Sequence, residues 1–510
     1  MIKVGGRPLT LHEFKEVIFD NSPVGISEEG LKKVNDSFSF LETFSDDKII
    51  YGINTGFGPM AQYRIDEVDR KQLQYNLIRS HASGVGQPLE PIYAKATMLA
   101  RLNTLAQGYS GVHLSTLEVI CELINKEVTP LIFEHGGVGA SGDLVQLAHL
   151  ALVLIGEGEV FYKGVRRPTE EVFKELSIKP LEIVNREGLA LMNGTSCMTG
   201  IGLINVILAR KIVRWGVEAS CLINEIVGTY NDHYSKELNH AKYHKGQRQV
   251  ADLMSSYLAD SKMVKSRQEH MYKGLREEEV FEEKVQEYYS LRCVPQILGP
   301  VLDTVSFTKK VLTEEINSGN DNPIIDVKTQ NVYHGGNFHG DYVSLEMDKL
   351  KIAITKASML AERQLNFVLN KNLNNILPPF VNRGKLGFNF GMQGVQFTAV
   401  STTAENQMLS NPMYVHSIPN NNDNQDIVSM GTNAALITKK VIDNSFEVMS
   451  ILFMSLTMAV DLMECKDKLS STSQRVFDEI REVFPTFIED HPKYDEVRKV
   501  KEYLITSKDI

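Results

Sequence analysis

Long segments in which apolar residues recur at helical spacing constrain the fold of this chain most. Residues 117–124 show apolar side chains at i, i+3, i+4 and i+7, and residues 350–361 repeat the pattern with several alanines. The S-x-x-E pattern of residues 115–118 predicts a capping box at the start of the first helix, and Pro130 predicts its end. We therefore expect a mainly α fold, an elongated bundle of long helices with small β appendages and a glycine-rich loop.

Strand-like segments are few and short. They cover residues 159–162, residues 324–327 and residues 331–333. No linker, low-complexity tract or fixed repeat divides the 510 residues, for which length alone suggests about three domains. We instead expect one intertwined architecture, in which residues 1–200 carry the functional loops and residues 201–510 form the long-helix core and the C-terminal helices.

Composition excludes several classes of partner. The chain has 54 Lys and Arg against 64 Asp and Glu, a formal charge of −10, so a basic face for nucleic acid or an anionic membrane is not expected. Residues 448–460, the most apolar stretch, are shorter than the roughly 18 residues that span a bilayer and predict a buried core helix. The five cysteines include no C-x-x-C pair, which favours reduced thiols in a cytoplasmic protein over disulfides or a zinc site.

The densest local pattern is the glycine-rich segment of residues 135–143, His-Gly-Gly-Val-Gly-Ala-Ser-Gly-Asp. Gly137, Gly139 and Gly142 match the dinucleotide fingerprint G-x-G-x-x-G, and helical spacing resumes at Leu144. A dinucleotide site needs a βαβ unit in an alternating α/β domain, and no further buried parallel strands follow. A nucleotide-dependent oxidoreductase is therefore the weaker interpretation, and a loop that only turns the chain is a second one.

The full string Val138-Gly139-Ala140-Ser141-Gly142-Asp143-Leu144 resembles the signature of the histidine and phenylalanine ammonia-lyase family. In that family the Ala-Ser-Gly triplet cyclises by itself into 4-methylideneimidazole-5-one (MIO). The resemblance implies that the amide nitrogen of Gly142 attacks the carbonyl of Ala140, and that loss of water turns Ser141 into an electrophilic methylidene. Neighbouring glycines permit the tight backbone that this ring closure requires.

Further strings match the family in chain order. Residues 51–58, Tyr-Gly-Ile-Asn-Thr-Gly-Phe-Gly, resemble its lid segment, in which Tyr51 matches the catalytic base and Gly58 a substrate-binding position. A tyrosine has an ordinary pKa near 10 and must be activated to accept a proton at neutral pH. Asn193 matches an asparagine that lies beside the prosthetic group.

Two later strings concern the substrate. Residues 289–293, Tyr-Ser-Leu-Arg-Cys, match a segment in which Tyr289 has a catalytic role and Arg292 binds the substrate carboxylate, with Gln286 before it. The planar guanidinium of arginine can bind a carboxylate with two hydrogen bonds. The strings of residues 320–323 and 335–339 are also family-like, and Phe338 matches an aromatic residue at the active site.

Five further residues are expected to bind the substrate: Ser80, His81, Asn421, Asn424 and Gln425. Histidine lyases also carry Ser-His at the first pair, phenylalanine-using relatives carry Phe-Leu, and some tyrosine-using ones His-Leu. Asn424 and Gln425 belong to the Asn-Gln-Asp pattern of phenylalanine and tyrosine lyases, whereas histidine lyases place Glu at the position of Gln425. His81 can hydrogen-bond a phenol hydroxyl, which an apolar pocket would leave unpaired at a cost of roughly 1–3 kcal/mol.

Two departures from the usual family pattern weaken the histidine assignment further. The loop has Gly137-Val138 where Ser-Val is usual, and Val145-Gln146 where Ala-Pro is usual. The chain is therefore similar to bacterial tyrosine ammonia-lyases, and the expected reaction is the non-oxidative deamination of L-tyrosine to p-coumarate and ammonia. Histidine ammonia-lyase activity giving urocanate, an MIO-dependent tyrosine 2,3-aminomutase and a non-catalytic helical scaffold remain open.

The expected prosthetic group is MIO alone, with no nucleotide and no metal. His149, His339 and the pair His240 and His244 have no carboxylate-rich cluster beside them and are expected to be structural or surface residues. The expected partner is a small-molecule substrate, a free amino acid, with no nucleic acid and no membrane. The resemblance also implies a homotetramer whose active sites take residues from three subunits. Amine or ring attack on MIO, lid dynamics and pathway context stay undecided.

Overall fold

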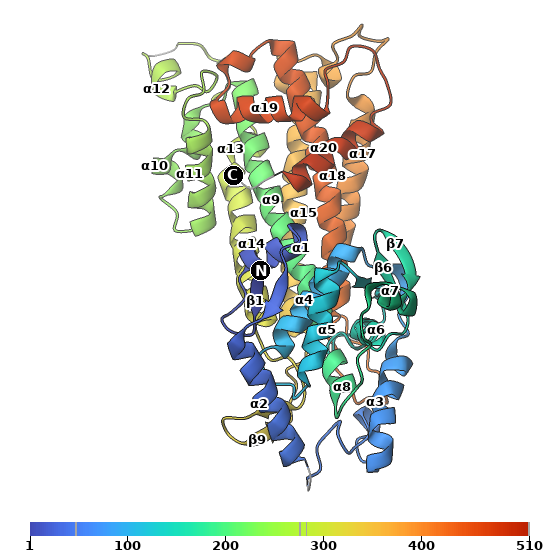
Figure 1. The fold of residues 1–510 in the computed structure, drawn as a ribbon. Helices are drawn as coiled ribbons and strands as arrows, with labels where there is room; N and C mark the ends of the chain where they lie inside the picture. Colours follow the sequence, from blue (N-terminus) through green and yellow to red (C-terminus); the bar gives the residue numbers. More distant parts are fainter. Residues whose placement is uncertain (46–47, 275–276, 282, 508–510) are drawn as a thin grey trace. The chain divides into compact units, whose positions relative to one another are not determined.

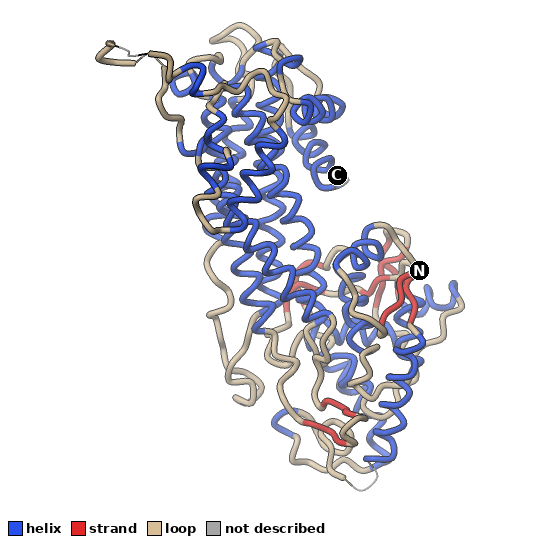
Figure 2. Tube along the Cα trace, turned by 90° about the vertical axis from the view of Figure 1, so that its left-hand side faces the viewer, coloured by secondary structure: helices blue, strands red, loops and turns tan. Residues whose placement is uncertain are grey.

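The computed structural model describes residues 1–45, 48–274, 277–281 and 283–507. Helices make up most of this part of the chain and the strands are short (Figure 2), which confirms the predicted mainly α class. The chain forms two compact units, each built from three stretches. Unit 1 comprises Met1–Ile207, Thr308–Asp348 and Pro412–Lys439, and unit 2 comprises Leu208–Phe307, Lys349–Asn411 and Lys440–Ile510. The division expected at residue 200 stays a prediction.

Unit 1 carries most of the short elements and all of the strands among the described residues. In chain order these are β1 (Ile2–Val4), α1 (Leu11–Phe19), β2 (Val24–Ile26), α2 (Glu28–Phe44), a 3₁₀ turn (Gly58–Met60), α3 (Glu67–His81), β3 (Val85–Pro88), α4 (Pro91–Leu105), α5 (Leu114–Asn125), β4 (Thr129–Pro130), β5 (Phe133–His135), α6 (Leu144–Leu154), β6 (Glu159–Tyr162), β7 (Val165–Pro168), α7 (Thr169–Leu176), α8 (Glu187–Met192), β8 (Ile324–Asp326) and β9 (Asn331–Tyr333). Four of the five boundaries between the units fall within α9 (Ser196–Val227), α14 (Val294–Ile316), α15 (Asp341–Leu369) and α18 (Gly431–Met463), and the fifth lies in the loop between Asn411 and Pro412.

Helices α3, α6 and α8 pack against one another in unit 1 (Figure 1). Helix α6 begins directly after the glycine-rich segment, as the spacing predicts, and α8 ends directly before Asn193. This packing positions two of the predicted site segments. Strand β5, which precedes the glycine-rich segment, pairs antiparallel with β3, so the parallel βαβ context of a dinucleotide site is not formed there.

The capping box predicted for residues 115–118, at the start of helix α5, is wrong. Helix α5 begins at Leu114, one residue before Ser115, and its cap is His113, whose ring nitrogen accepts the N–H of Ser115 at 3.3 Å. An imidazole nitrogen can replace the usual hydroxyl as the acceptor for a free N–H of the first turn. The strand predictions are confirmed by β6, which pairs with β7, and by the β8–β9 hairpin.

Unit 2 contains the longest parts of the long helices and several short ones. Besides its shares of α9, α14, α15 and α18, these are a 3₁₀ turn (Asn231–Tyr234), α10 (Lys236–Asn239), α11 (Lys245–Tyr257), α12 (Arg267–His270), α13 (Tyr289–Arg292), α16 (Lys371–Asn374), a 3₁₀ turn (Pro379–Val381), α17 (Gln393–Leu409), a 3₁₀ turn (Lys466–Lys468), α19 (Ser471–Val483) and α20 (Tyr494–Thr506). Trp215 is fully buried in its core, where it meets Phe453 edge to face at 5.4 Å and donates to the carbonyl of Leu504 at 2.9 Å.

Helices α9 and α18 are each long and apolar enough to cross a membrane by length and composition alone. However, 94% and 78% of their most apolar windows are buried inside the structure, as in the core helices of globular proteins. The apolar stretch of residues 448–460 lies within α18, so its helix is longer than the sequence pattern indicates. Ser450 and Ser455 in this stretch donate to carbonyls one turn earlier, which satisfies their buried hydroxyls.

Candidate active site

The Ala140-Ser141-Gly142 triplet lies in a tight loop between β5 and α6. Gly139 and Gly142 adopt positive φ angles of 77° and 69°. A Cβ atom on Gly142 would lie 2.1 Å from the carbonyl oxygen of Gly194, and one on Gly139 would lie 2.1 Å from Ser429 Oγ. Only glycine fits both this backbone conformation and this close packing, so the loop has the bend that cyclisation of the triplet requires.

Segments from distant parts of unit 1 fix this loop in place. The carbonyl of Gly139 accepts the N–H of Gly340 and the hydroxyl of Ser429, both at 3.0 Å. The carbonyl of Val138 accepts the N–H of Met430 at 2.9 Å. Because these partners follow Phe338 and Gln425 closely in sequence, the same contacts bring two further predicted site segments to the loop.

Asp143, directly after the triplet, is fully buried and caps α9 rather than its own helix. Its carboxylate accepts the N–H groups of Cys197 and Met198 at 2.8 and 2.9 Å, and the hydroxyl of Thr432. Burial raises the pKa of Asp143 to about 6, against the lowering effect of these hydrogen bonds. The N–H of Asp143 donates to the carbonyl of Gly194 at 2.8 Å, so this residue joins the loop to the segment that carries Asn193.

Two side-chain amides flank Ser141. Asn193 Nδ2 donates to the Ser141 carbonyl at 3.2 Å, and Gln425 Nε2 donates to the Ser141 hydroxyl at 3.0 Å. Asn193 Oδ1 is buried without a hydrogen-bond partner among the described residues. A strained glycine loop, a serine hydroxyl between two amides and an unsatisfied buried acceptor fit the formation and binding of MIO at this position.

Tyr51 lies in the lid segment with its hydroxyl held by the backbone. The N–H of Gly58 donates to Tyr51 Oη at 3.0 Å, and the N–H of Tyr51 donates to His334 Nε2 at 3.4 Å. Asn421 closes over Gly58, because its Nδ2 lies 2.8 Å from where a Cβ of Gly58 would be. The structure thus brings Tyr51, Gly58 and Asn421 together.

A tight turn of residues 420–425 carries both the lid contact and the Ser141 contact. Asn420 and Gln425 exchange backbone hydrogen bonds of 3.2 and 3.3 Å, and the N–H of Asn424 donates to the carbonyl of Asn421 at 3.1 Å. Asn421, Asn422 and Asp423 all have positive φ angles, a region that Asn and Asp tolerate better than other side chains. The turn therefore presents Asn421 to Gly58 and Gln425 to Ser141.

Ser80 and His81 end helix α3. His81 Nδ1 lies 3.0 Å from the carbonyl of Leu77 and 3.0 Å from the hydroxyl of Ser80. Because a carbonyl only accepts, Nδ1 carries the hydrogen in the neutral ring and Nε2 is left as an acceptor. Phe338 is half-buried two residues before Gly340, which contacts the loop.

The remaining predicted residues, Gln286, Tyr289 and Arg292, belong to unit 2. Arg292 Nη1 donates to Gln286 Oε1, and its guanidinium lies 4.8 Å from the ring centre of Tyr289. Arg292 Nε is buried without a partner among the described residues. Gln286 and Tyr289 line a cavity of about 650 Å³ together with Phe367. The three residues thus form one cluster with an unpaired cationic donor.

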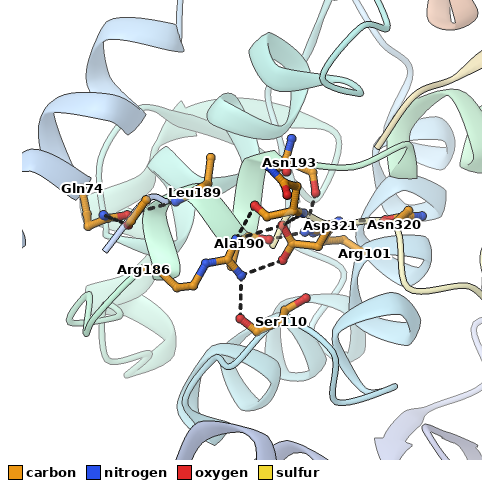
Figure 3. Close-up of polar contacts among 11 residues, drawn as sticks. Gln74, Arg101, Ser110, Arg186, Leu189, Ala190, Asn193, Asn320 and Asp321 are labelled. Carbon is orange, nitrogen blue, oxygen red and sulfur yellow. Dashed lines mark hydrogen bonds and ion pairs between the residues drawn. The ribbon is translucent and has the colours of Figure 1, made fainter. Parts of the chain in front are cut away.

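A buried polar network behind the loop was missed by the sequence analysis (Figure 3). Arg101 donates to the carbonyls of Ala190 and Asn193 and to Asn320 Oδ1, and burial lowers its pKa to about 10. Arg186 forms a fully buried ion pair with Asp321 at 3.0 Å. Helix α4 also carries Lys95 and Asn103, so no local sequence signal singled out Arg101.

The two departures from the family pattern prove to be spatial neighbours. Gln146 is fully buried and donates to the carbonyl of Glu134 at 3.3 Å. A Cβ on Gly137 would lie 2.4 Å from Gln146 Oε1, so the side chain of Gln146 occupies the space that a residue larger than glycine would need. The two changes therefore compensate for each other.

The histidines outside the site have structural contacts. His149 Nε2 accepts the N–H of Gly84 at 3.0 Å and its pKa is lowered by burial. His240 contacts Asp252 at 2.9 Å, and His339 lies 3.6 Å from Asp341. Within the described ranges, no three His, Cys, Asp or Glu residues gather in a way that could hold a metal ion.

Known proteins match the chain over nearly its whole length. The aromatic amino acid lyase family matches residues 9–482. A tyrosine 2,3-aminomutase of Chondromyces crocatus is 36% identical over 510 residues, 99% of this chain and 96% of the relative. A histidine ammonia-lyase of Halalkalibacterium halodurans is 37% identical over 500 residues, 98% of this chain and 95% of the relative. The solved tyrosine aminomutase of Streptomyces globisporus is 34% identical with a TM-score of 0.93, covering 99% of this chain and 96% of that one.

This chain therefore belongs to the aromatic amino acid lyase family. It is an enzyme of the ammonia-lyase or aminomutase type, and the family is consistent with a free amino acid as its small-molecule substrate. The family uses MIO as its prosthetic group.

Proposed function

We propose that this enzyme deaminates L-tyrosine to p-coumarate and ammonia, with MIO formed from Ala140-Ser141-Gly142. The observation that carries the proposal is the neutral amide of Gln425, 3.0 Å from the Ser141 hydroxyl. A carboxylate there would attract a basic imidazole by charge, and an amide does not. An uncharged aromatic ring is therefore favoured over histidine.

His81 supports the choice of tyrosine over phenylalanine. Its Nδ1–H donates within α3 to Leu77, so Nε2 is the atom left to accept a phenol O–H. A phenyl ring would leave that acceptor unpaired, which costs about 1–3 kcal/mol when the site is dry.

The residues of the chain divide the reaction among them. MIO, when present, supplies an electrophile that withdraws electrons from the bound amino acid and makes ammonia a better leaving group. The carboxylate pairs with the guanidinium of Arg292, a half-buried side chain that Gln286 orients through Nη1. Tyr51, as phenolate, removes a proton from Cβ, and the Gly58 N–H stabilises the negative charge on its oxygen. The C–N bond breaks as the Cα–Cβ double bond forms, ammonia leaves, and the hydroxyl of Tyr51 returns its proton to water.

A tyrosine 2,3-aminomutase is the second candidate. Proteins of that name are among the relatives that match the chain over nearly its full length. Such an enzyme would add the ammonia back at Cβ and give β-tyrosine. Histidine ammonia-lyase is the third candidate, which the Ser80-His81 pair and a relative of that name favour.

Purified protein should be incubated separately with L-tyrosine, L-histidine and L-phenylalanine, and the products separated by chromatography. We expect p-coumarate to form fastest, and the intact mass to be two waters below the sequence mass. Urocanate as the fastest-forming product would overturn the tyrosine assignment, and β-tyrosine as the main product would establish the aminomutase.

We also propose a cytoplasmic homotetramer, which the family resemblance supports. Tyr289 is 69% exposed in the single chain, as expected for a site residue that another subunit covers. Native mass spectrometry should give four times the chain mass. A stable monomer with full turnover would contradict this.

A further inference from the structure

Gln74 is a fully buried glutamine in the middle of helix α3, and both ends of its amide are paired (Figure 3). Nε2 donates to the carbonyl of Gly52 in the lid segment at 3.1 Å, and Oε1 accepts the N–H of Leu189 in α8 at 3.1 Å. One side chain thus links the lid segment to α8, in a place where solvent is excluded.

Each partner of Gln74 is one step from a group of the proposed reaction. Gly52 directly follows Tyr51 in the chain. Leu189 accepts the N–H of Asn193 through its carbonyl at 2.9 Å, and Asn193 in turn donates to Ser141. A continuous series of hydrogen bonds therefore leads from the backbone beside the proposed base to the serine of the triplet.

The backbone is closely packed on both sides of the Gln74 side chain. Gly52 has a φ of 79°, and a Cβ on it would lie 2.5 Å from Leu189 Cδ2. A Cβ on Gly188 would lie 2.8 Å from Gln74 Oε1. Glycines at both positions let the lid segment, α3 and α8 approach closely enough for a single glutamine to span them.

We infer that Gln74 is a positioning residue, which sets the location of Tyr51 relative to Asn193 and Ser141 through Gly52 and Leu189. The inference rests on the proposed function for the roles of those three residues. Proton transfer from Cβ depends on the distance between donor and acceptor, and a misplacement of about 1 Å can cost roughly 100-fold in rate.

Gln74→Glu is the sharpest test, because it keeps the size of the side chain and the acceptor for Leu189 but replaces the donor to Gly52. We expect kcat to fall roughly 10- to 100-fold with little change in KM. The introduced carboxylic acid can still donate when protonated, so the ratio of variant to wild-type kcat should rise as the pH is lowered. Gln72→Glu is the matched control and should behave as wild type, because Gln72 is exposed on the same helix and its side chain donates to Asn76.

Two further readouts separate positioning from general damage. Intact mass should show the same two-water loss in Gln74→Glu as in wild type. If the fraction of cyclised protein instead fell by the same factor as kcat, the inference would be overturned. In a Tyr51→Phe background, Gln74→Glu should reduce the residual turnover no further. An equal fold-reduction in both backgrounds, or unchanged kcat in Gln74→Glu, would also overturn it.

Gln74→Met serves if the glutamate variant does not fold. It should show the same fall in kcat without the recovery at low pH, and faster hydrogen exchange at residues 51–58; wild-type kcat and exchange would refute the role. The substrate is whichever amino acid the wild type uses fastest, so failure of the tyrosine assignment leaves this test intact. If the wild type has no turnover, the proposed function fails, and hydrogen exchange of residues 51–58 alone decides whether Gln74 positions the lid segment.

Discussion

The candidate residues around Ser141 and those around Arg292 differ in how many of their polar groups are buried and hydrogen-bonded within the single chain. Around Ser141 in unit 1, backbone carbonyls and a buried carboxylate are paired, two side-chain amides donate to Ser141, and glycines lie where no side chain fits. Asn193 Oδ1 is the exception, a buried acceptor without a partner among the described residues. Around Arg292 in unit 2, α13 is one helical turn, Tyr289 is exposed and Arg292 Nε has no partner among the described residues.

This difference follows from the two tasks. The proposed ring closure within the triplet would need one backbone conformation before any substrate arrives, and the buried hydrogen bonds around Ser141 hold the loop in one conformation. Recognition of a carboxylate needs a cation with unsatisfied donors that the substrate can reach. The comparison predicts that changes near Ser141 alter the protein itself, whereas changes near Arg292 alter only its use of substrate.

Ser141→Ala should have the largest effect. Without the hydroxyl no methylidene can form. The intact mass should therefore lie one water below the sequence mass of the variant, or equal it, instead of lying two waters below, and nearly all turnover should disappear. Ser39→Ala, on the exposed face of α2, is the control. Undiminished turnover in Ser141→Ala would remove the basis of the proposed chemistry.

Arg292→Gln should come next and should leave the mass signature unchanged. Loss of a charged partner for the carboxylate is expected to cost about 2–4 kcal/mol, roughly 30- to 700-fold in kcat/KM. Steady-state kinetics measure this, with exposed Arg210→Gln for comparison. A fall in the cyclised fraction would show that the two regions are not independent.

His81→Leu should have a smaller effect that is confined to substrate choice. Removing the acceptor for the phenol hydroxyl should lower the ratio of tyrosine to phenylalanine turnover by about 5- to 150-fold. Competition between the two amino acids measures the ratio directly. The exposed His12→Leu variant should keep the wild-type ratio, and an equal ratio in His81→Leu would refute the assignment.

His149→Gln should have the smallest effect and concerns stability. Burial lowers the pKa of His149 in the folded state, so the folded protein binds fewer protons than the unfolded chain. Stability from this group is therefore present above the ordinary pKa of about 6.5 and is lost as the pH falls below it. Glutamine can keep an acceptor for Gly84 without titrating. Thermal unfolding should depend less on pH in the variant, and an equal pH dependence would exclude His149 as a source.

Sequence patterns predicted the helical class, the start of α6, the β8–β9 hairpin and the family. Repetition at helical spacing is a local property, so it is visible without the fold. The start of α5 was wrong because a histidine took the place of the expected hydroxyl cap. The apolar stretch of residues 448–460 predicted a buried core helix but not its bounds, because α18 continues through less apolar residues on its N-terminal side.

The candidate residues were identified singly, but their partners were not. That Gln425 reaches Ser141, or that Asn421 closes over Gly58, depends on a turn nearly three hundred residues or more from those sites in sequence. Gln74 and Arg101 lie in regular helices, where no local pattern distinguishes them from ordinary polar residues.

The sequence by itself determined what is local: the helical periodicity, and a triplet whose proposed cyclisation would join atoms of neighbouring residues. Only the tertiary structure decided that the side chain of Gln146 fills the space beside Gly137, that Asp143 caps α9 and not α6, and that Gln74 joins the lid segment to α8. These depend on close packing between segments far apart in the chain, where a single Cβ atom decides whether two backbones can approach.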